Sequence, residues 1–383
     1  MATYTHPFMP LSAAEITLAA SIIRALNPPN VSLRFKGITL REPPKDLMIQ
    51  YLTAERLGQP TINIPRKAFA NYYISGTARF FEVIINLSNQ KLQRNIRVVD
   101  GLNGPVDDAE IVEVEKIALA DPAVQAEIVK LELPDDAVVV CDPWIWGTDS
   151  IEGGKRQYQC YMYLRDPANS KEEDGNHYAL PLVFSPVVDT VTMKVTKIYM
   201  LPTGVDASTK STEKWVPKGP NEYIPSANKL REDLNELQVV QPNGASFTAE
   251  GDVIKWQKWE FRLGFNIREG MVLYNVSYDG RPLFYRVSLS DMCIPYTDPR
   301  SPMCKKQAFD LGDSGAGMMA NDLKLGCDCL GSILYKDGLI TDQEGKPLLK
   351  KNAMCIHEQD YGIGWKHTSY RTGGAAVVRN REL

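Results

Sequence analysis

The sequence is poor in histidine and cysteine, has no strong charge of either sign and contains no long apolar run. Its 383 residues include only four histidines, so a metal site made of three histidines would use nearly all of them: His6, His177, His357 and His367. Seven cysteines are too few for a disulfide framework, although they allow one bridge or buried thiols. Because 43 basic and 47 acidic residues leave a net charge of −4, neither nucleic acid nor an anionic membrane is expected as the main partner.

No stretch reaches the roughly 20 apolar residues that span a bilayer, and the start lacks a basic region followed by an apolar run. Neither a membrane anchor nor a secretory signal is therefore predicted. What the sequence does have is an ordinary globular composition, with 44% hydrophobic and 23% charged residues. At about 100–200 residues per domain, the length predicts two or three domains.

Residues 1–100 are predicted to form a small α+β domain. Ser12 and Glu15 have the spacing of a capping box, and apolar residues follow at helical spacing, which predicts a helix at 13–26. Alternating apolar residues predict a first strand, and two further strands flank a glycine, which places strands at 31–41, 72–75 and 77–86.

Residues 101–205 have the same order of helix first and sheet second, which predicts a second small α+β domain. The segment 107–136 carries ten acidic residues, and its apolar positions lie near helical spacing. Asp121 and Pro122 divide this segment into two short helices, because proline is favoured at the first position of a helix, and the acids then form a solvated face. Strands are predicted at 137–141, 157–164, 179–185 and 192–200.

Residues 206–245 are rich in proline, glycine, serine, threonine and lysine, and are predicted to be a linker with a short helix near 227–237 that Ser226 caps. From residue 246 the pattern is one of strands, and Asp279-Gly280 has the sequence of a tight hairpin turn. The region 246–383 is therefore predicted to be the beginning of a β-sandwich, with strands at 253–266, 271–278, 282–290, 329–336 and 352–357.

Two short segments have the residue types of acid–base or nucleophilic catalysis. Gly312-Asp-Ser-Gly315 resembles the nucleophile segment of trypsin-like serine proteases. A serine nucleophile needs a histidine base, and neither His6 nor His177 stands in a suitable context, so a protease is not expected. Asp310 is flanked by two apolar residues that could desolvate it and suit it to act as a general base, although a turn-forming aspartate is the simpler alternative.

Cysteine and histidine residues near the end of the chain are candidates for a metal site. Cys327 and Cys329, with Cys355 and His357, could hold a zinc ion, or one cysteine of each pair could form a disulfide, and the spacing leaves both open. His357 and His367, with two acids between them, could also bind copper, iron or zinc, although isolated histidines in a sheet are more often ordinary polar residues.

Several ordered motifs in the last third of the chain resemble copper amine oxidases. The matching segments are Arg262-Leu-Gly-Phe-Asn-Ile-Arg-Glu-Gly270, residues 282–292, Pro295-Tyr-Thr-Asp-Pro299, Phe309-Asp-Leu-Gly312, Leu325-Gly-Cys-Asp-Cys-Leu-Gly331, residues 352–360 and Trp365-Lys-His367. Cys141-Asp-Pro-Trp144 and the helix-then-sheet pattern upstream match the same family more weakly. The resemblance therefore covers nearly the whole chain.

The resemblance implies an α+β protein with two small, cystatin-like α+β domains followed by a large β-sandwich that carries catalysis and forms a homodimer. It implies an oxidoreductase that converts primary amines and O2 to aldehyde, ammonia and hydrogen peroxide. The family's cofactors are one copper ion and topaquinone, which copper and O2 make from a tyrosine of the chain. A buried aspartate removes the α-proton of the amine.

Individual residues match the family's site by motif. Asp310 matches the proton-abstracting base, and Tyr296 matches the tyrosine that hydrogen-bonds the quinone oxygen. Ala308 matches the gate of the amine channel, and Trp144 matches a wall of this channel. Ser314 stands beside the base, where the family has a tyrosine, so an aromatic ring is replaced by a small side chain that leaves room for water or a bulkier amine.

The cysteine and histidine candidates are also affected by the resemblance. Cys329 and Cys355 match the family's disulfide, which argues against zinc at this place. His357 and His367 fall within the matching motif, but they match no copper ligand. A further departure is Gln359, where the family has an acid.

The family's quinone tyrosine and its copper histidines lie beyond the point that matches Leu383. We therefore expect this chain by itself to bind neither copper nor topaquinone and to be inactive alone, as the N-terminal portion of a copper amine oxidase. The alternative is a non-catalytic or repurposed homologue that acts as a partner subunit, or as a redox-free base catalyst through Asp310. Without a predicted signal peptide, the expected location is the cytoplasm or the peroxisome.

Overall fold

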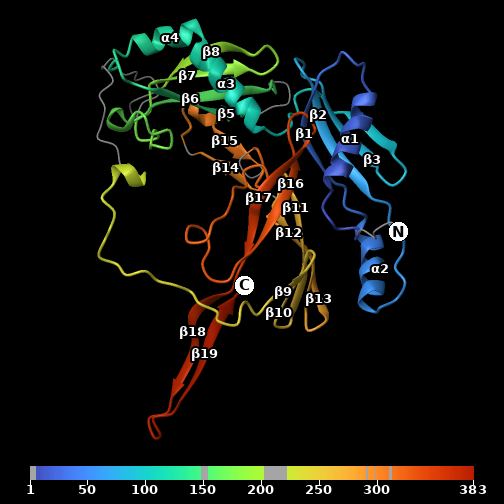
Figure 1. Cartoon of the computed structure of the whole chain (residues 1–383). Helices are drawn as coiled ribbons and strands as arrows, with labels where there is room; N and C mark the ends of the chain where they lie inside the picture. Colours follow the sequence, from blue (N-terminus) through green and yellow to red (C-terminus); the bar gives the residue numbers. More distant parts are fainter. Residues whose placement is uncertain (1–5, 148–153, 202–221, 290–291, 297, 310–312) are drawn as a thin grey trace.

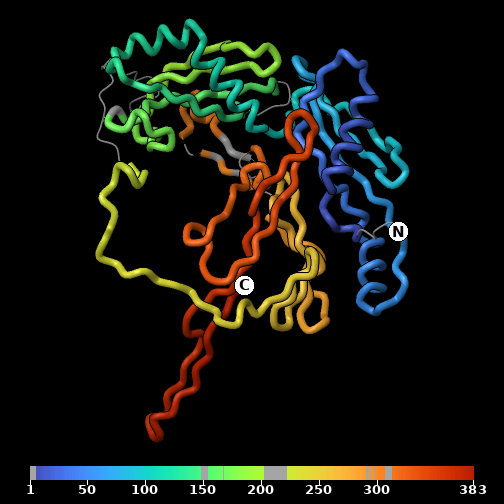
Figure 2. Tube along the Cα trace, viewed as in Figure 1, coloured from blue at the N-terminus to red at the C-terminus, as the bar shows by residue number. Residues whose placement is uncertain are grey.

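The structure, a computed structural model, describes residues 6–147, 154–201, 222–289, 292–296, 298–309 and 313–383 (Figure 1). Its helices and sheets form two helix-and-sheet domains and a third part made of antiparallel sheets and hairpins, so the predicted α+β class is confirmed. Figure 2 shows a long extended segment, in yellow, that leads into the third part. Among the described residues, no helix combines the length and the apolar character that crossing a bilayer requires.

The first domain is a four-stranded antiparallel sheet with helices, in the strand order β1-β2-β3-β4. Its helix α1 starts with the predicted capping box: the Ser12 hydroxyl accepts from the Glu15 N–H at 3.3 Å, and the Glu15 carboxylate accepts from the Ser12 N–H at 2.9 Å. The apolar stripe of α1 is buried on the sheet. The elements are α1 (Ala13–Ala25), β1 (Leu33–Leu40), α2 (Lys45–Arg56), β2 (Lys67–Ile74), β3 (Phe80–Asn86) and β4 (Lys91–Arg97).

Helix α2 is not predicted by the sequence pattern. Pro44 at its N-cap offers no side-chain hydrogen bond to the first turn, so the usual start signal is missing. Its apolar face packs against residues of the third part and of the N-terminus, with Met48, Tyr51 and Leu52 meeting Phe8, Val272 and Tyr274. This helix therefore depends on tertiary packing, which supplies most helical stability in proteins.

The second domain places two helices on a four-stranded antiparallel sheet of order β5-β6-β7-β8. The Asp107 carboxylate caps α3 by accepting from the Glu110 N–H at 2.8 Å, and Asp121 caps α4 by accepting from the Ala123 N–H at 2.9 Å, so the predicted division into two helices is confirmed. The elements are α3 (Asp108–Ala120), α4 (Pro122–Val129), β5 (Val139–Ile145), β6 (Gln157–Leu164), β7 (Phe184–Asp189) and β8 (Lys194–Met200).

The predicted strand at 179–185 is wrong in its position, because β7 starts at Phe184. A turn closed by the Leu180 N–H, which donates to the His177 carbonyl at 3.0 Å, occupies the start of the predicted range. The apolar residues that suggested a strand there, Leu180 and Leu182, are buried in the core of the second domain without belonging to a regular strand.

Five charged residues meet between the first two domains, and we call them the domain-joint cluster: Arg34, Lys36, Asp107, Glu110 and Arg156. The Lys36 ammonium lies 2.5 Å from the Asp107 carboxylate and 2.6 Å from that of Glu110. Arg34 donates to Asp107 at 2.7 Å, and Arg156 donates to Glu110. Four of the five side chains are at most 6% exposed, so cations and anions neutralise one another away from water.

The pKa values in the domain-joint cluster follow from burial and charge together. Burial would raise the pKa of Asp107, but the hydrogen bonds and charges of Arg34 and Lys36 hold it below its usual range. Burial would also raise the pKa of Glu110, and the charges of Arg156 and Lys36 lower it instead. Both carboxylates therefore stay ionised at neutral pH, which keeps the pairing intact.

The third part contains a five-stranded antiparallel sheet and three two-stranded hairpins. The sheet has the order β13-β12-β11-β10-β9 and consists of β9 (Thr248–Glu250), β10 (Val253–Trp256), β11 (Trp259–Asn266), β12 (Gly270–Tyr278) and β13 (Arg281–Val287). The hairpins are β14 (Cys293–Pro295) with β15 (Gln307–Phe309), β16 (Leu334–Thr341) with β17 (Pro347–Ile356), and β18 (Gln359–Thr368) with β19 (Ala375–Glu382). The β18–β19 hairpin extends away from the rest of the protein (Figure 1).

Three predictions for this region are wrong in detail. The predicted strand at 329–336 is misplaced, because β16 starts at Leu334. The predicted strand at 253–266 is two strands, since the chain turns at Gln257, whose φ is 54°. The predicted helix near 227–237 is absent from the described residues, which contain only a short 3-10 turn at Pro225–Ala227. The apolar residues of that segment, Leu230, Leu234 and Leu237, are 61–82% exposed, so no core stabilises a helix.

Candidate functional site

The β14–β15 hairpin contains Ala308 and leads directly into Tyr296, which are two of the candidate residues of the sequence. Ile294 is paired with Ala308, and Pro295 is paired with Gln307. Tyr296 therefore leaves β14 beside Lys306, which precedes β15, whereas Phe309 at the other end of β15 is paired with Cys293. Asp310 itself lies outside the described residues, and for Ala308 the structure gives the backbone position in β15.

The hairpin is attached to the second domain at the end of β5. The backbones of Trp146 and Lys306 form an isolated bridge, and the Gly147 N–H donates to the Lys305 carbonyl at 3.0 Å. Trp144 lies two residues earlier on β5, so it faces the hairpin. This attachment explains how a residue of the second domain reaches the site of the third part.

Three aromatic rings surround the Lys306 ammonium, and we call them the aromatic cage: Trp144, Tyr161 and Tyr296. The Lys306 Nζ lies 4.5 Å from the ring centroids of Trp144 and Tyr161 and 4.7 Å from that of Tyr296. These distances are within the roughly 6 Å at which a cation is attracted to an aromatic face. The rings of Trp144 and Tyr296 meet edge to face, with centroids 5.6 Å apart.

Hydrogen bonding and burial fix the cage. The Trp144 indole N–H donates to the Asp142 carboxylate at 3.0 Å, which sets the orientation of the indole ring. Tyr161 is buried, and its hydroxyl has no hydrogen-bond partner among the described residues. Burial raises the pKa of this phenol well above its ordinary value, so it stays protonated. Tyr296 is 41% exposed, which opens the cage to solvent on one side.

Ser314 lies in a different environment from the aromatic cage. It is 7% exposed and lines a cavity of about 600 Å³ between the first domain and the third part, together with Glu269 and Arg286. Burial would raise the pKa of Glu269, but its hydrogen bonds with Arg286 and other donors lower it to about 2. The described residues therefore do not bring Ser314 into contact with Tyr296 or Trp144.

Close packing of the backbone explains why a glycine follows Ser314 in the sequence. Gly315 has a φ of 99°, and a Cβ on this residue would lie 2.6 Å from the Ile267 carbonyl oxygen. The Ala316 N–H donates to the Arg268 carbonyl at 2.7 Å, and the Met318 N–H donates to the Ile267 carbonyl at 2.9 Å. The protease-like sequence of this segment is thus explained by close backbone packing against the turn between β11 and β12.

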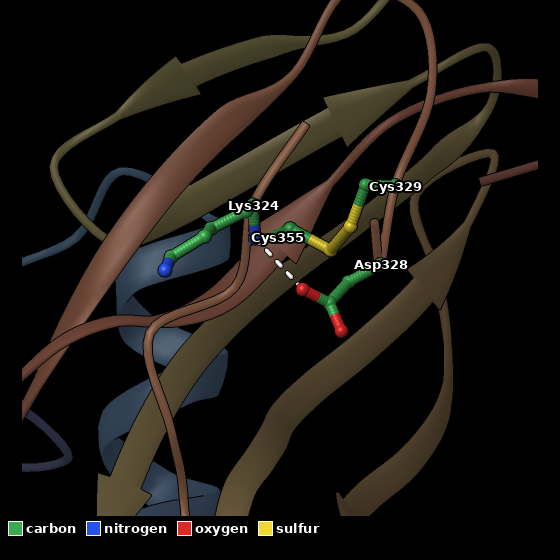
Figure 3. Close-up of a disulfide and its surroundings, with 4 residues drawn as sticks. All are labelled: Lys324, Asp328, Cys329 and Cys355. Atoms are coloured by element: carbon green, nitrogen blue, oxygen red, sulfur yellow. Dashed lines mark hydrogen bonds between the residues drawn. A yellow bond between two sulfur atoms is a disulfide. The ribbon is translucent and has the colours of Figure 1, made fainter. Parts of the chain in front are cut away.

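Cys329 and Cys355 form a disulfide, which Figure 3 shows beside Asp328 and Lys324. The Asp328 carboxylate accepts from the Lys324 N–H at 2.8 Å and closes the loop that carries Cys329. A nitrogen of His357 lies within 4.8 Å of both sulfur atoms. The bridge uses the two thiolates that a zinc ion would need, so the structure favours the disulfide over a zinc site.

The described residues do not assemble a set of three imidazoles. Their one group with metal-binding spacing is Cys329, Cys355 and His357, in which both sulfurs are already bonded. His367 lies on the β18–β19 hairpin and stacks on Trp365, with ring centroids 6.1 Å apart. This donor set does not fit the copper ion that the family uses, and we derive no chemical step through copper or topaquinone.

Glu358, in the motif that contains His357, has a role that the sequence did not reveal. Its buried carboxylate accepts hydrogen bonds from the Trp256 indole at 2.8 Å, the Ser246 N–H at 2.7 Å and the Gln241 amide at 2.7 Å. Burial would raise the pKa of Glu358, but these donors lower it to about 2. Glu358 thus ties the linker to the sheets of the third part.

The chain matches three family models, which follow one another along the sequence. Residues 6–97 match the copper amine oxidase N2 domain, residues 109–215 match the N3 domain, and residues 248–383 match the enzyme domain. The fold and the matches define the class of the primary amine oxidases, which are oxidoreductases. The chain belongs to the copper amine oxidase family.

Individual relatives agree with this assignment. Copper amine oxidase 1 of Aspergillus niger is 38% identical over 393 residues, covering 99% of this chain and 58% of the relative. The peroxisomal primary amine oxidase of Pichia angusta is 35% identical, covering 97% of this chain and 52% of the relative. The crystal structure of a copper-containing benzylamine oxidase from Hansenula polymorpha matches with a TM-score of 0.92 and 42% identity, covering 98% of this chain and 59% of that one. The chain thus spans 52–59% of the length of these relatives.

Proposed function

We propose that the whole protein oxidises primary amines with O2 to aldehyde, ammonia and hydrogen peroxide, and that this chain supplies the proton-abstracting base and walls of the amine path. The observation that carries the proposal is the β14–β15 hairpin. It pairs Pro295 with Gln307, which sets Tyr296 beside Lys306, and the ring of Tyr296 meets that of Trp144 of the second domain edge to face.

Each residue has a distinct part in this proposal. Asp310 takes the α-proton of the amine, and its apolar neighbours in the sequence raise its basicity toward the working pH. Tyr296 donates a hydrogen bond to the quinone oxygen, Ala308 forms the gate, and Trp144 excludes water from one side of the path. Copper and topaquinone would supply the oxidation, and the residues that hold them are not among those described.

The proposal is tested by hydrogen peroxide release from the whole protein with benzylamine as the amine. Asp310→Asn should lower the turnover number by about 10²–10⁴-fold, which is the range for losing a general base. The control Asp279→Asn removes one carboxylate at an exposed hairpin turn, where the asparagine tolerates the φ of 52°, and turnover should stay within about twofold. Equal turnover in Asp310→Asn and the unmodified protein would contradict the assignment of the base.

We also propose that the protein forms a homodimer through the β18–β19 hairpin. An isolated two-stranded hairpin is marginally stable in water, and this one carries exposed apolar side chains that another surface would cover: Tyr361, Ile363, Trp365, Val377 and Val378. Sedimentation of the whole protein should give twice the monomer mass, and Trp365→Ser should weaken the dimer. A monomer with an intact fold would contradict the proposal.

The domain limits and the location are proposals of the same kind. We assign residues 1–100 and 101–205 to the two small domains, 206–245 to the linker and 246–383 to part of the catalytic β-sandwich. The peroxisome or the cytoplasm is the proposed location, since one relative is named a peroxisomal primary amine oxidase. Fluorescent tagging of the whole protein tests the location, and proteolysis, which should cut first in the linker, tests the limits.

A further inference from the structure

Lys306 is a half-buried cation for which the proposed function has no use. Its ammonium lies at nearly equal distances from three aromatic rings. Among the described residues, no carboxylate lies within 4.0 Å of it to form an ion pair. The nearest acidic influence comes from Asp142, whose carboxylate already accepts the hydrogen bond of Trp144. The positive charge of Lys306 is therefore attracted by the rings and forms no ion pair with a carboxylate of the described residues.

The backbone keeps this charge in place. Lys306 is bridged to Trp146, and the carbonyl of Lys305 accepts from the Gly147 N–H at 3.0 Å. The side chain starts from a residue fixed on both sides and ends between three rings that belong to two domains. A long lysine side chain normally moves its ammonium into water, so a fixed position between rings is a property of this site.

The three ring faces of the aromatic cage can hold only one ammonium group at a time. A second ammonium would be attracted to the aromatic cage if it were empty, because aromatic faces carry partial negative charge. With Lys306 in the cage, the same place repels a second ammonium. Occupation by Lys306 thus converts a surface that attracts cations into one that repels them.

We propose that Lys306 is a specificity-determining residue: its caged ammonium is a fixed positive charge beside the amine path that disfavours amines with a second cationic group, so that the protein prefers monoamines. This inference rests on the proposed function, because it takes Trp144 and Tyr296 as walls of the path. Repulsion between two like charges at a partly buried site makes a difference of about tenfold in selectivity reasonable.

The test compares benzylamine with 1,4-diaminobutane through the ratio of their kcat/KM values in the whole protein. Lys306→Met should lower the preference for benzylamine by about tenfold, mainly through a better KM for the diamine. Lys306→Arg keeps the charge and the attraction to the rings, so it should keep the preference. Lys305→Met removes the same net charge from the neighbouring position and should change the ratio less than about twofold. An unchanged ratio in Lys306→Met, or an equal change in Lys305→Met, would overturn the proposal.

A binding measurement separates this inference from the proposed function. Calorimetric titration of the same two amines into the unmodified protein and Lys306→Met reports affinity without any turnover. If no amine is oxidised but the diamine binds about tenfold more tightly to Lys306→Met, the oxidase function fails and the role of Lys306 stands. If neither protein discriminates between the two amines in binding or in turnover, the role of Lys306 is wrong.

Discussion

Lys36 is a buried lysine and Lys306 is a half-buried one, and their surroundings differ in kind. Lys36 lies in the domain-joint cluster, where two carboxylates lie within 2.6 Å of its ammonium. Lys306 lies in the aromatic cage, where the described residues offer three rings and no carboxylate within 4.0 Å. The first arrangement neutralises charge and holds two domains together. The second leaves a positive charge that can repel a cationic group of a bound amine, and this repulsion is what selectivity between amines requires.

The pKa values of the two lysines depend on the same forces in different proportions. Burial lowers the pKa of Lys36, and the charge of Arg156 lowers it further, while Glu110 and Asp107 act in the opposite direction. Burial also lowers the pKa of Lys306, and only the more remote Asp142 acts against it. The comparison predicts that the same substitution will have very different effects on stability at the two positions.

The largest expected effect is that of Lys36→Met. Removing the ammonium takes one ion-pair partner from both Asp107 and Glu110, which keep only Arg34 and Arg156, and breaking buried ion pairs in this way costs about 3–5 kcal/mol. Urea unfolding of the whole protein, followed by circular dichroism, measures the loss. Lys91→Met, on the exposed strand β4, is the matched control and should change stability by less than about 0.5 kcal/mol. A loss below about 1 kcal/mol in Lys36→Met would mean that the cluster does not hold the domains.

The next effect concerns the disulfide of the third part. Cys329→Ser opens a loop of 26 residues, which should cost about 3 kcal/mol in the chain-entropy model. A thiol reductant should destabilise the unmodified protein by a similar amount and leave Cys329→Ser unchanged. Cys327→Ser removes an exposed free thiol close by and serves as the control. Equal stability of both variants in the absence of reductant would show that the bridge contributes nothing.

Much of the fold was predictable because local signals agree with packing. The capping box of Ser12 and Glu15 marked α1, Asp121-Pro122 divided the acidic helices, and the Asp279-Gly280 turn joins β12 to β13 as expected. Helix α2 could not be predicted, since its support comes from residues about 220 positions away in the sequence. The predicted helix near 227–237 failed for the opposite reason, because its apolar residues meet no partner.

The candidate site was predictable only where a motif carried it. Tyr296 and Trp144 were expected near the amine path from the family resemblance, and the structure brings their rings together. Tyr161 and Lys306 lie outside all the segments that resemble the family. Tyr161 is one of many apolar or aromatic residues on β6, and no periodicity distinguishes the ring that faces a lysine of another domain. The one signal in the sequence that pointed to Lys306 was its position four residues before Asp310, the candidate base.

Lowering the pH is expected to have a smaller effect on the unfolding free energy. The pKa of Asp107 in the folded protein lies below its unfolded value, so its ion pairs contribute stability that is present above the unfolded pKa of about 4 and is lost as the pH falls through the folded value. The unfolding free energy should fall by about 1 kcal/mol more between pH 6 and pH 3 in the unmodified protein than in Asp107→Asn. Parallel pH profiles of the two proteins, measured by urea unfolding, would contradict this.

The smallest effect is expected for Lys306→Met. Losing the attraction between the ammonium and the rings costs about 0.5–2 kcal/mol, but the substitution also removes the cost of keeping a charge away from water. Methionine has a similar length, and its sulfur makes favourable contacts of its own with aromatic rings. The two contributions nearly cancel, so the unfolding free energy should change by less than about 1 kcal/mol, against about 3–5 kcal/mol for Lys36→Met. Both variants belong in one urea series on the whole protein. A loss in Lys306→Met as large as that in Lys36→Met would mean that the caged lysine holds the domains together, and the distinction between the two lysines would then be wrong.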